Sequence, residues 1–100
     1  MEKNRELIWD IFTLLKFEKA LAWIAETSFQ NAEQVEHAIL EKAKIIKLNP
    51  EYFPPDKYKE NNTGNYRAFE THSFRVAYRY TETEVRIVQF RHIKQNPQIY

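Results

Sequence analysis

The chain has 100 residues, of which 43% are hydrophobic and 15% aromatic, and we expect one globular domain over residues 1–100 rather than a disordered chain. The absence of cysteine excludes a disulfide scaffold and a thiolate metal site. The net charge of +1 divides into −2 for residues 1–55 and +3 for residues 56–100, which is either ordinary fluctuation or a basic C-terminal half facing an anionic partner.

The first twelve residues lack the long apolar core of a signal peptide, and no apolar run approaches the ~18 residues that a membrane span needs. We therefore expect a cytoplasmic protein with no membrane partner. Within this stretch, the residues from Glu6 to Phe12 form a short apolar run that is rich in β-branched and aromatic side chains. Such a run predicts a first strand.

Two amphipathic helices follow in the prediction. The first begins after a Thr13 cap, fades at residues 26–27, and carries an apolar stripe at Leu14, Phe17, Leu21 and Ile24. The second begins at Ser28 or at Asn31 and ends at Asn49, because the residue before a proline avoids the α-helical region. Its stripe is Ala32, Val35, Ile39, Ala43 and Ile46. The short connection implies an antiparallel helical hairpin, and Trp9 and Trp23 are candidates for the core.

Residues 50–65 contain three of the four prolines and the only glycine, which predicts a long loop. Long ordered loops are often functional. Asp56 is either a turn residue after Pro54-Pro55 or a reactive carboxylate. Lys57 and Lys59 are either solvated or part of a basic binding surface.

Three strands are predicted after the loop, at Tyr66–Thr71, Phe74–Thr81 and Glu84–His92. Side chains alternate between the two faces of a strand, so the middle strand turns Phe74, Val76, Tyr78 and Tyr80 toward one face and Arg75, Ala77 and Arg79 toward the other. One face can pack on helices while the other offers guanidinium groups. The last strand does not alternate cleanly, which predicts covering on both faces or a bulge.

The arginines of this region are the candidate binding residues, because guanidinium groups make bidentate contacts with phosphate or carboxylate. They are Arg67, Arg75, Arg79, Arg86 and Arg91. Alternatively, Arg67 and Arg75 pair with Glu70, Glu82 or Glu84 and stabilise the sheet. His92 is predicted to be a structural histidine that hydrogen-bonds a loop. Three scattered histidines make no convincing metal site, and one glycine makes no phosphate-binding loop.

Three segments carry a family resemblance: SFQNAEQVEHAILEKAKIIKLNP, GNYRAF and FRVAYRYTETEVRIVQFRH, followed by a proline near the end. From about Ile8 to Pro97 the chain resembles the RelE/ParE superfamily of small bacterial toxins from type II toxin–antitoxin systems, often labelled plasmid stabilisation proteins. The resemblance implies an α+β fold: an N-terminal strand, and an antiparallel helical hairpin packed on a mainly antiparallel sheet that three C-terminal strands complete. It also implies growth inhibition by the free toxin and neutralisation by a cognate antitoxin, which we expect to cover the arginine face.

The superfamily has two kinds of target. ParE-type members inhibit DNA gyrase by binding, and RelE-type members are metal-independent endoribonucleases that cut mRNA on the ribosome. Cleaving RNA without a metal requires activation of the 2′-hydroxyl, cations on the phosphate and a proton for the leaving oxygen. For a ribonuclease, the resemblance implies that the catalytic residues are Arg67, Arg75, Lys59, His92 and Tyr100. Asp56 lies near the position where some members hold a carboxylate base. The partner- or RNA-binding residues are Arg67, Arg75, Arg79, Arg91, Lys57 and Lys59.

The end of the chain departs from the nuclease pattern. Nuclease members that use histidine usually carry it at or near the C-terminus, often beside a tyrosine, whereas His92 ends the last predicted strand and is followed by a polar turn and a proline. This arrangement resembles the ParE branch. We therefore favour a gyrase inhibitor, with a ribosome-dependent ribonuclease or a toxin fold without toxicity as alternatives. We expect no cofactor, no metal and no small-molecule substrate.

Overall fold

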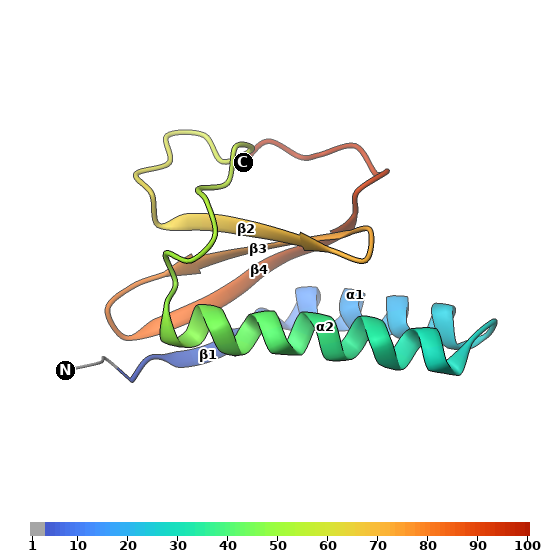
Figure 1. Ribbon diagram of the computed structural model, residues 1–100. Helices are drawn as coiled ribbons and strands as arrows, with labels where there is room; N and C mark the ends of the chain where they lie inside the picture. Colours follow the sequence, from blue (N-terminus) through green and yellow to red (C-terminus); the bar gives the residue numbers. More distant parts are fainter. Residues whose placement is uncertain (1–3) are drawn as a thin grey trace.

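The computed structural model describes residues 4–100, and its elements follow the predicted order (Figure 1). They are strand β1 (Glu6–Trp9), helices α1 (Ile11–Ala25) and α2 (Phe29–Leu48), and strands β2 (Tyr66–Thr71), β3 (Phe74–Tyr80) and β4 (Glu84–His92). The predicted α+β class with a helical hairpin is confirmed. Within residues 4–100, no helix is long and apolar enough to cross a bilayer.

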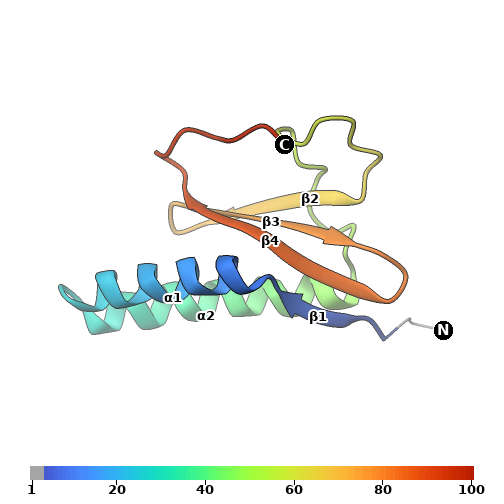
Figure 2. The same ribbon diagram turned by 180° about the vertical axis from the view of Figure 1, so that it is seen from behind.

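The four strands form one sheet in the order β1-β4-β3-β2. Strand β3 is antiparallel to both β2 and β4, whereas β1 is parallel to β4, so the sheet is mixed. Both helices lie on one side of the sheet, while the loop before β2 and the C-terminal tail after β4 lie on the other side (Figures 1 and 2). The loop and the tail are therefore able to cover the sheet face that the helices leave open, which we call the outer face.

The prediction for the N-terminal region was wrong beyond Trp9, because the strand ends there and Phe12 is already helical. Asp10 is the helix cap, since its carboxylate accepts a hydrogen bond from the Thr13 N–H at 3.3 Å. Thr13, the predicted cap, lies buried in the first turn and donates its hydroxyl to the Val88 carbonyl at 2.9 Å. Thr13 therefore ties α1 to β4 instead of starting the helix.

The second helix begins and ends as predicted. Ser28 is the cap, and its Oγ accepts a hydrogen bond from the Asn31 N–H at 3.1 Å, so the alternative cap at Asn31 is wrong. The helix ends at Leu48, with Asn49 as the last capping residue before Pro50. Strand β3 ends at Tyr80, one residue earlier than predicted.

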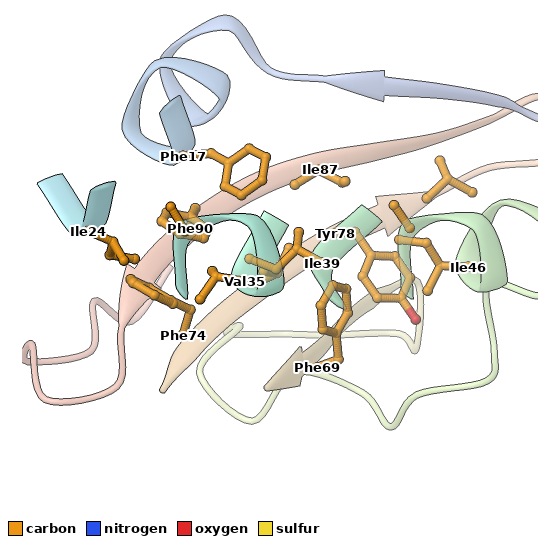
Figure 3. Packing of buried hydrophobic residues seen from close by; sticks show 14 residues of the cluster. Phe17, Ile24, Val35, Ile39, Ile46, Phe69, Phe74, Tyr78, Ile87 and Phe90 are labelled. Atoms are coloured by element: carbon orange, nitrogen blue, oxygen red, sulfur yellow. The ribbon is translucent and has the colours of Figure 1, made fainter. Parts of the chain in front are cut away.

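The core lies between the helical hairpin and the sheet (Figure 3). The core residues labelled in Figure 3 are Phe17, Ile24, Val35, Ile39, Ile46, Phe69, Phe74, Tyr78, Ile87 and Phe90. Tyr78 is fully buried and donates its hydroxyl to the Pro50 carbonyl at 2.7 Å, so its one polar group is satisfied. Trp9 stacks on Phe17 with ring centroids 5.0 Å apart, as a core residue should. Trp23 is 72% exposed, so its prediction as a core residue was wrong.

The irregular pattern of the last strand comes from a bulge, one of the two predicted alternatives. Ala77 pairs with Gln89 and Tyr78 pairs with Ile87, which leaves Val88 as an extra residue in β4. The bulge allows Ile87 and Phe90 to point into the same core although they are three residues apart. It also sets the register of the outer face, where Arg75 pairs with Arg91 and Arg79 pairs with Arg86.

Candidate functional site

Directly opposed arginines repel each other across a sheet, so the outer face needs carboxylates near these pairs. Glu84 serves one pair: its Oε2 lies 3.0 Å from Arg86 Nε and 3.5 Å from Arg79 Nη2. The two arginine side chains are 36% and 33% exposed. One carboxylate is therefore shared by the two guanidinium groups at this end of the face.

The other arginine pair lies beneath the loop, which inserts Asp56 over it. Asp56 is only 3% exposed, although aspartate is rarely buried unless it is paired. Its Oδ1 lies 2.8 Å from Arg75 Nη2, and its Oδ2 accepts the Tyr100 hydroxyl proton at 2.6 Å. The Tyr58 N–H donates to Oδ1 at 3.1 Å, which is the turn role predicted for Asp56. Asp56 is thus both a turn residue and a buried anion.

Arg75 has a second carboxylate partner, because its Nη1 lies 2.9 Å from Glu70 Oε2. The predicted pairing of Arg75 with Glu70 is confirmed. The Arg75 side chain is 12% exposed. Burial alone lowers the pKa of Arg75, but the hydrogen bonds and charges of Asp56 and Glu70 outweigh burial and raise it. Arg75 is therefore a permanently charged group whose Nη1 and Nη2 atoms each already bind a carboxylate.

The ionisation of Asp56 and Tyr100 is shifted in opposite directions. Burial alone raises the pKa of Asp56, but hydrogen bonds from Tyr100, Arg75 and the Tyr58 N–H, together with the Arg75 charge, bring it below its ordinary value. For Tyr100, burial and the hydrogen bond to Asp56 both raise the pKa. At neutral pH the pair is a fixed carboxylate and a fixed phenol.

Tyr100 also anchors the C-terminal tail to the loop. Its N–H donates to the Tyr58 carbonyl at 3.1 Å, and its carbonyl accepts from the Glu60 N–H at 2.7 Å. The Lys59 ammonium lies 5.5 Å from the Tyr100 ring centroid and 4.9 Å from that of Tyr66. Asp56 and Tyr100, whose side chains are hydrogen-bonded, are 44 residues apart in the sequence. The tail is thus part of the site, which its polar sequence did not predict.

Tyr58 was not among the predicted site residues, yet three cations surround its ring. The Arg75 and Arg91 guanidinium carbons lie 4.9 and 5.3 Å from the ring centroid, and Lys57 Nζ lies 5.2 Å from it. The only sequence signal was an aromatic residue between two lysines in a long loop. We call the assembly the Asp56 cluster; its members are Asp56, Tyr58, Lys59, Glu70, Arg75, Arg91 and Tyr100.

Arg67 and His92 do not belong to this cluster. Arg67 pairs with Tyr78, so it starts from the core-facing side of the sheet, and it donates to the carbonyls of Gly64, Phe53 and Glu51 at 2.8, 2.9 and 3.3 Å. It fastens the loop rather than pairing with the predicted glutamates.

His92 pairs with Phe74 in the sheet and lies edge-on to its ring, with centroids 5.4 Å apart. Its Nδ1 accepts the Lys94 N–H at 3.1 Å, which is the predicted structural role of a loop-bonding histidine. His92 and Arg75 thus lie on opposite faces of the sheet. Of the five predicted catalytic residues, the structure brings together Arg75, Lys59 and Tyr100.

The side chains of Asp56, Arg75 and Tyr100, at the centre of the Asp56 cluster, all have hydrogen-bond partners. No buried polar side-chain atom in the described range lacks a hydrogen-bond partner, and residues 4–100 contain no group of three histidines or carboxylates able to hold a metal ion. Lys57 is exposed at the margin of the cluster, and the side chains of Arg79 and Arg86, on the same face of the sheet, are 33% and 36% exposed. The cluster stabilises the fold of the loop and tail, and its margin can attract an anionic surface.

Two comparisons with known proteins bear on these residues. The family model described as the ParE toxin of the type II toxin–antitoxin system, parDE, matches residues 14–97. The match begins in α1 and ends in the tail, so it includes every member of the Asp56 cluster except Tyr100. A comparison with curated proteins gave no match.

Proposed function

The chain belongs to the ParE toxin family of type II toxin–antitoxin systems, and we propose that it arrests growth by binding and inhibiting DNA gyrase. Membership of the family makes it the toxin of a module and implies a cognate antitoxin as partner. Gyrase as the target is the proposal. It implies a cytoplasmic protein, because gyrase acts on DNA in the bacterial cytoplasm.

The observation that carries the proposal is the state of Arg75. In the nuclease interpretation this arginine would grip the scissile phosphate. Here it is 12% exposed and bound by the carboxylates of Asp56 and Glu70. A phosphate bound through both Nη1 and Nη2 would compete with both carboxylates. If it displaced Asp56, this buried carboxylate would lose its only cationic partner in the cluster within ion-pair distance. This arrangement supports binding through the surface rather than chemistry at Arg75.

The acid–base groups also argue against RNA cleavage. A general acid or base works best when its pKa lies near the operating pH. The pKa of Asp56 lies below its ordinary value and that of Tyr100 lies above its ordinary value, so both shifts lead away from neutrality. His92, the remaining predicted acid, lies on the other face of the sheet.

A ribosome-dependent ribonuclease is the second candidate, and one observation favours it. Lys59 and Tyr100 do lie beside Arg75 within the Asp56 cluster, and Lys57 and Arg91 flank the Tyr58 ring. Aromatic rings among cations suit RNA. Catalysis would require the tail to release Tyr100 from Asp56. A toxin fold without toxicity is the remaining alternative.

A supercoiling assay with purified gyrase tests the proposal. Relaxed plasmid, ATP and gyrase are incubated with increasing amounts of the full chain, and the supercoiled product is resolved on gels. We expect inhibition that saturates at a stoichiometric excess of the chain and that persists in Lys59→Met, because this change removes a charge that the nuclease interpretation needs and leaves the Arg75–Asp56–Tyr100 contacts in place. Full gyrase activity at a large excess of folded protein would overturn the proposal.

A further inference from the structure

A groove of about 780 Å³ lies beside the Asp56 cluster, between α1, the end of β4 and the tail. Figure 2 shows how these segments meet: the end of β4 and the first part of the tail run above the C-terminal half of α1. Helix α1 contributes Lys16, Lys19, Ala20 and Trp23 to the lining, at a spacing that selects one side of a helix. The groove is thus partly a helix face and partly a sheet end.

Exposed apolar side chains of α1 begin inside the groove, at Trp23, and continue beyond its lining toward the start of the helix. Trp23 is 72% exposed, and so is Phe12, which lies three turns earlier and within about 20° of Trp23 around the helix. Leu15, also on the exposed part of α1, is 50% exposed. Phe12 and Trp23 are about 16 Å apart along the helix axis, at roughly 1.5 Å per residue. Lys16 and Lys19 lie between Phe12 and Trp23 on the same side of the helix, so this face combines exposed apolar and cationic side chains. Such a combination marks an interaction site for an amphipathic partner of opposite charge.

The rim of the groove is cationic. Lys16, Lys19, Arg91 and Lys94 line it, and within the described part of the chain the lining contains no aspartate or glutamate. Arg91 donates to the backbone carbonyls of His92 and Gln95, which hold the guanidinium in position without neutralising it. Glu18, the acidic residue of α1, follows Lys16 by two positions and therefore lies on the opposite side of the helix.

We propose that this groove is the docking site for an acidic amphipathic helical segment of the cognate antitoxin. A partner helix of about three turns matches the row from Phe12 to Trp23, and its apolar residues at i, i+3/i+4 and i+7 would cover that row. Its carboxylates would face Lys16, Lys19, Arg91 and Lys94. A second copy of this chain fits less well, because its own lysines would meet this cationic rim. A nucleic acid would leave Phe12 and Leu15 uncovered.

This position differs from the predicted one over the arginine face. The loop and tail already occupy that face above Arg75, whose charge is balanced by Asp56 and Glu70. At the groove, by contrast, apolar surface and unbalanced cations lie next to each other. The antitoxin is therefore expected to reach only the margin of the Asp56 cluster, at Arg91.

The test measures binding of the purified, full-length antitoxin encoded beside this chain to the full chain and to surface variants. We expect Lys16→Glu/Lys19→Glu to raise the Kd at least tenfold, and Trp23→Ala to do the same. The matched controls are Lys42→Glu/Lys44→Glu, which makes the same charge change on α2, and Phe29→Ala, which truncates a 69% exposed aromatic residue. Both controls are expected to change the Kd less than threefold.

Tryptophan fluorescence gives a second readout without mutating the groove. The chain has two tryptophans, and Trp9 already stacks on Phe17, so burial of Trp23 by the antitoxin is expected to shift the emission to shorter wavelength. The shift should be absent in Trp23→Phe. Circular dichroism of each variant establishes that the fold is retained.

Three results would overturn the proposal. The first is an antitoxin that binds the groove variants and the control variants equally well. The second is a free chain that sediments as a dimer and becomes a monomer in Trp23→Ala, which would assign the groove to a second copy. The third is tight binding of a single-stranded dT oligonucleotide that Lys16→Glu/Lys19→Glu abolishes.

The inference rests on the proposed toxin role only through the existence of an antitoxin. Binding is measured without gyrase, so a chain that leaves gyrase active can still bind antitoxin through the groove. Conversely, gyrase inhibition combined with equal antitoxin binding by all variants would overturn only the proposal about the groove. The two proposals can therefore fail separately.

Discussion

Removing the Arg75 guanidinium should destabilise the fold before it affects any target. Asp56 is 3% exposed, and in Arg75→Ala its charge would keep only the Tyr100 hydroxyl and the Tyr58 N–H as partners. Breaking a buried ion pair from one side costs about 3–5 kcal/mol. Because Arg75 retains 12% exposure and Asp56 keeps two hydrogen bonds, we expect about 3 kcal/mol of lost unfolding free energy.

Urea denaturation followed by circular dichroism measures this loss, and a double-mutant cycle of Asp56→Asn with Arg75→Met isolates the pair. The control is Arg79→Ala, whose side chain is 33% exposed and lies 3.5 Å from its carboxylate partner; we expect it to cost under about 1 kcal/mol. Equal losses of stability in Arg75→Ala and Arg79→Ala would show that the buried Asp56–Arg75 pair stabilises the fold no more than an exposed ion pair does. If Arg75→Ala is strongly destabilised, its loss of toxicity in cells cannot be read as loss of a catalytic group.

Three further predictions follow from the same contacts. Tyr100→Phe removes the 2.6 Å hydrogen bond to Asp56 and should cost about 1.5–3 kcal/mol in urea denaturation; an unchanged midpoint would contradict the anchoring of the tail. The pKa of Asp56 is lowered by folding from its ordinary 3.8, so stability should fall as pH drops below about 5 and through the folded pKa. Thermal melts against pH should give a smaller acid-induced loss in Asp56→Asn, and equal losses would count against the buried carboxylate. Burial raises the pKa of Tyr78 above its ordinary 10.0, so the unfolded chain releases this proton at a lower pH than the folded chain does. The free energy of unfolding should therefore drop by about 1.4 kcal/mol by pH 11 because of Tyr78. A flat stability between pH 9 and pH 11 would exclude this effect.

The sequence predicts β2, β3, β4 and α2 well because each has strong local signals. Alternation marks β3, short hairpin connections separate β3 from β2 and β4, and Ser28 and Pro50 bound the second helix. The start of α1 is harder, because Asp10 and Thr13 are both competent caps and the apolar residues between them suit strand and helix alike. Trp23 was assigned to the core on its residue type, although its place on the helix turns it to solvent.

The Asp56 cluster could be predicted only in parts. Alternation along β3 places Arg75 and Arg79 on one face, but the bulge at Val88 decides which β4 arginines join them. The meeting of Asp56 with Tyr100 depends on the path of a loop and a tail, for which hydropathy gives no period. Arg67 and Phe69 are two residues apart in β2 and therefore lie on the same, core-facing side of the sheet, so strand alternation could have predicted the position of Arg67.

We propose that the Asp56 cluster stabilises the fold and is not a catalytic site. The most direct measurement is primer extension on mRNA bound to programmed ribosomes, in the presence of an excess of the folded chain, with Tyr100→Phe and Lys59→Met as comparison variants. We expect intact mRNA with all three proteins. Cuts in the A-site codon that the wild-type chain makes and the two variants do not would contradict this proposal and establish the ribonuclease.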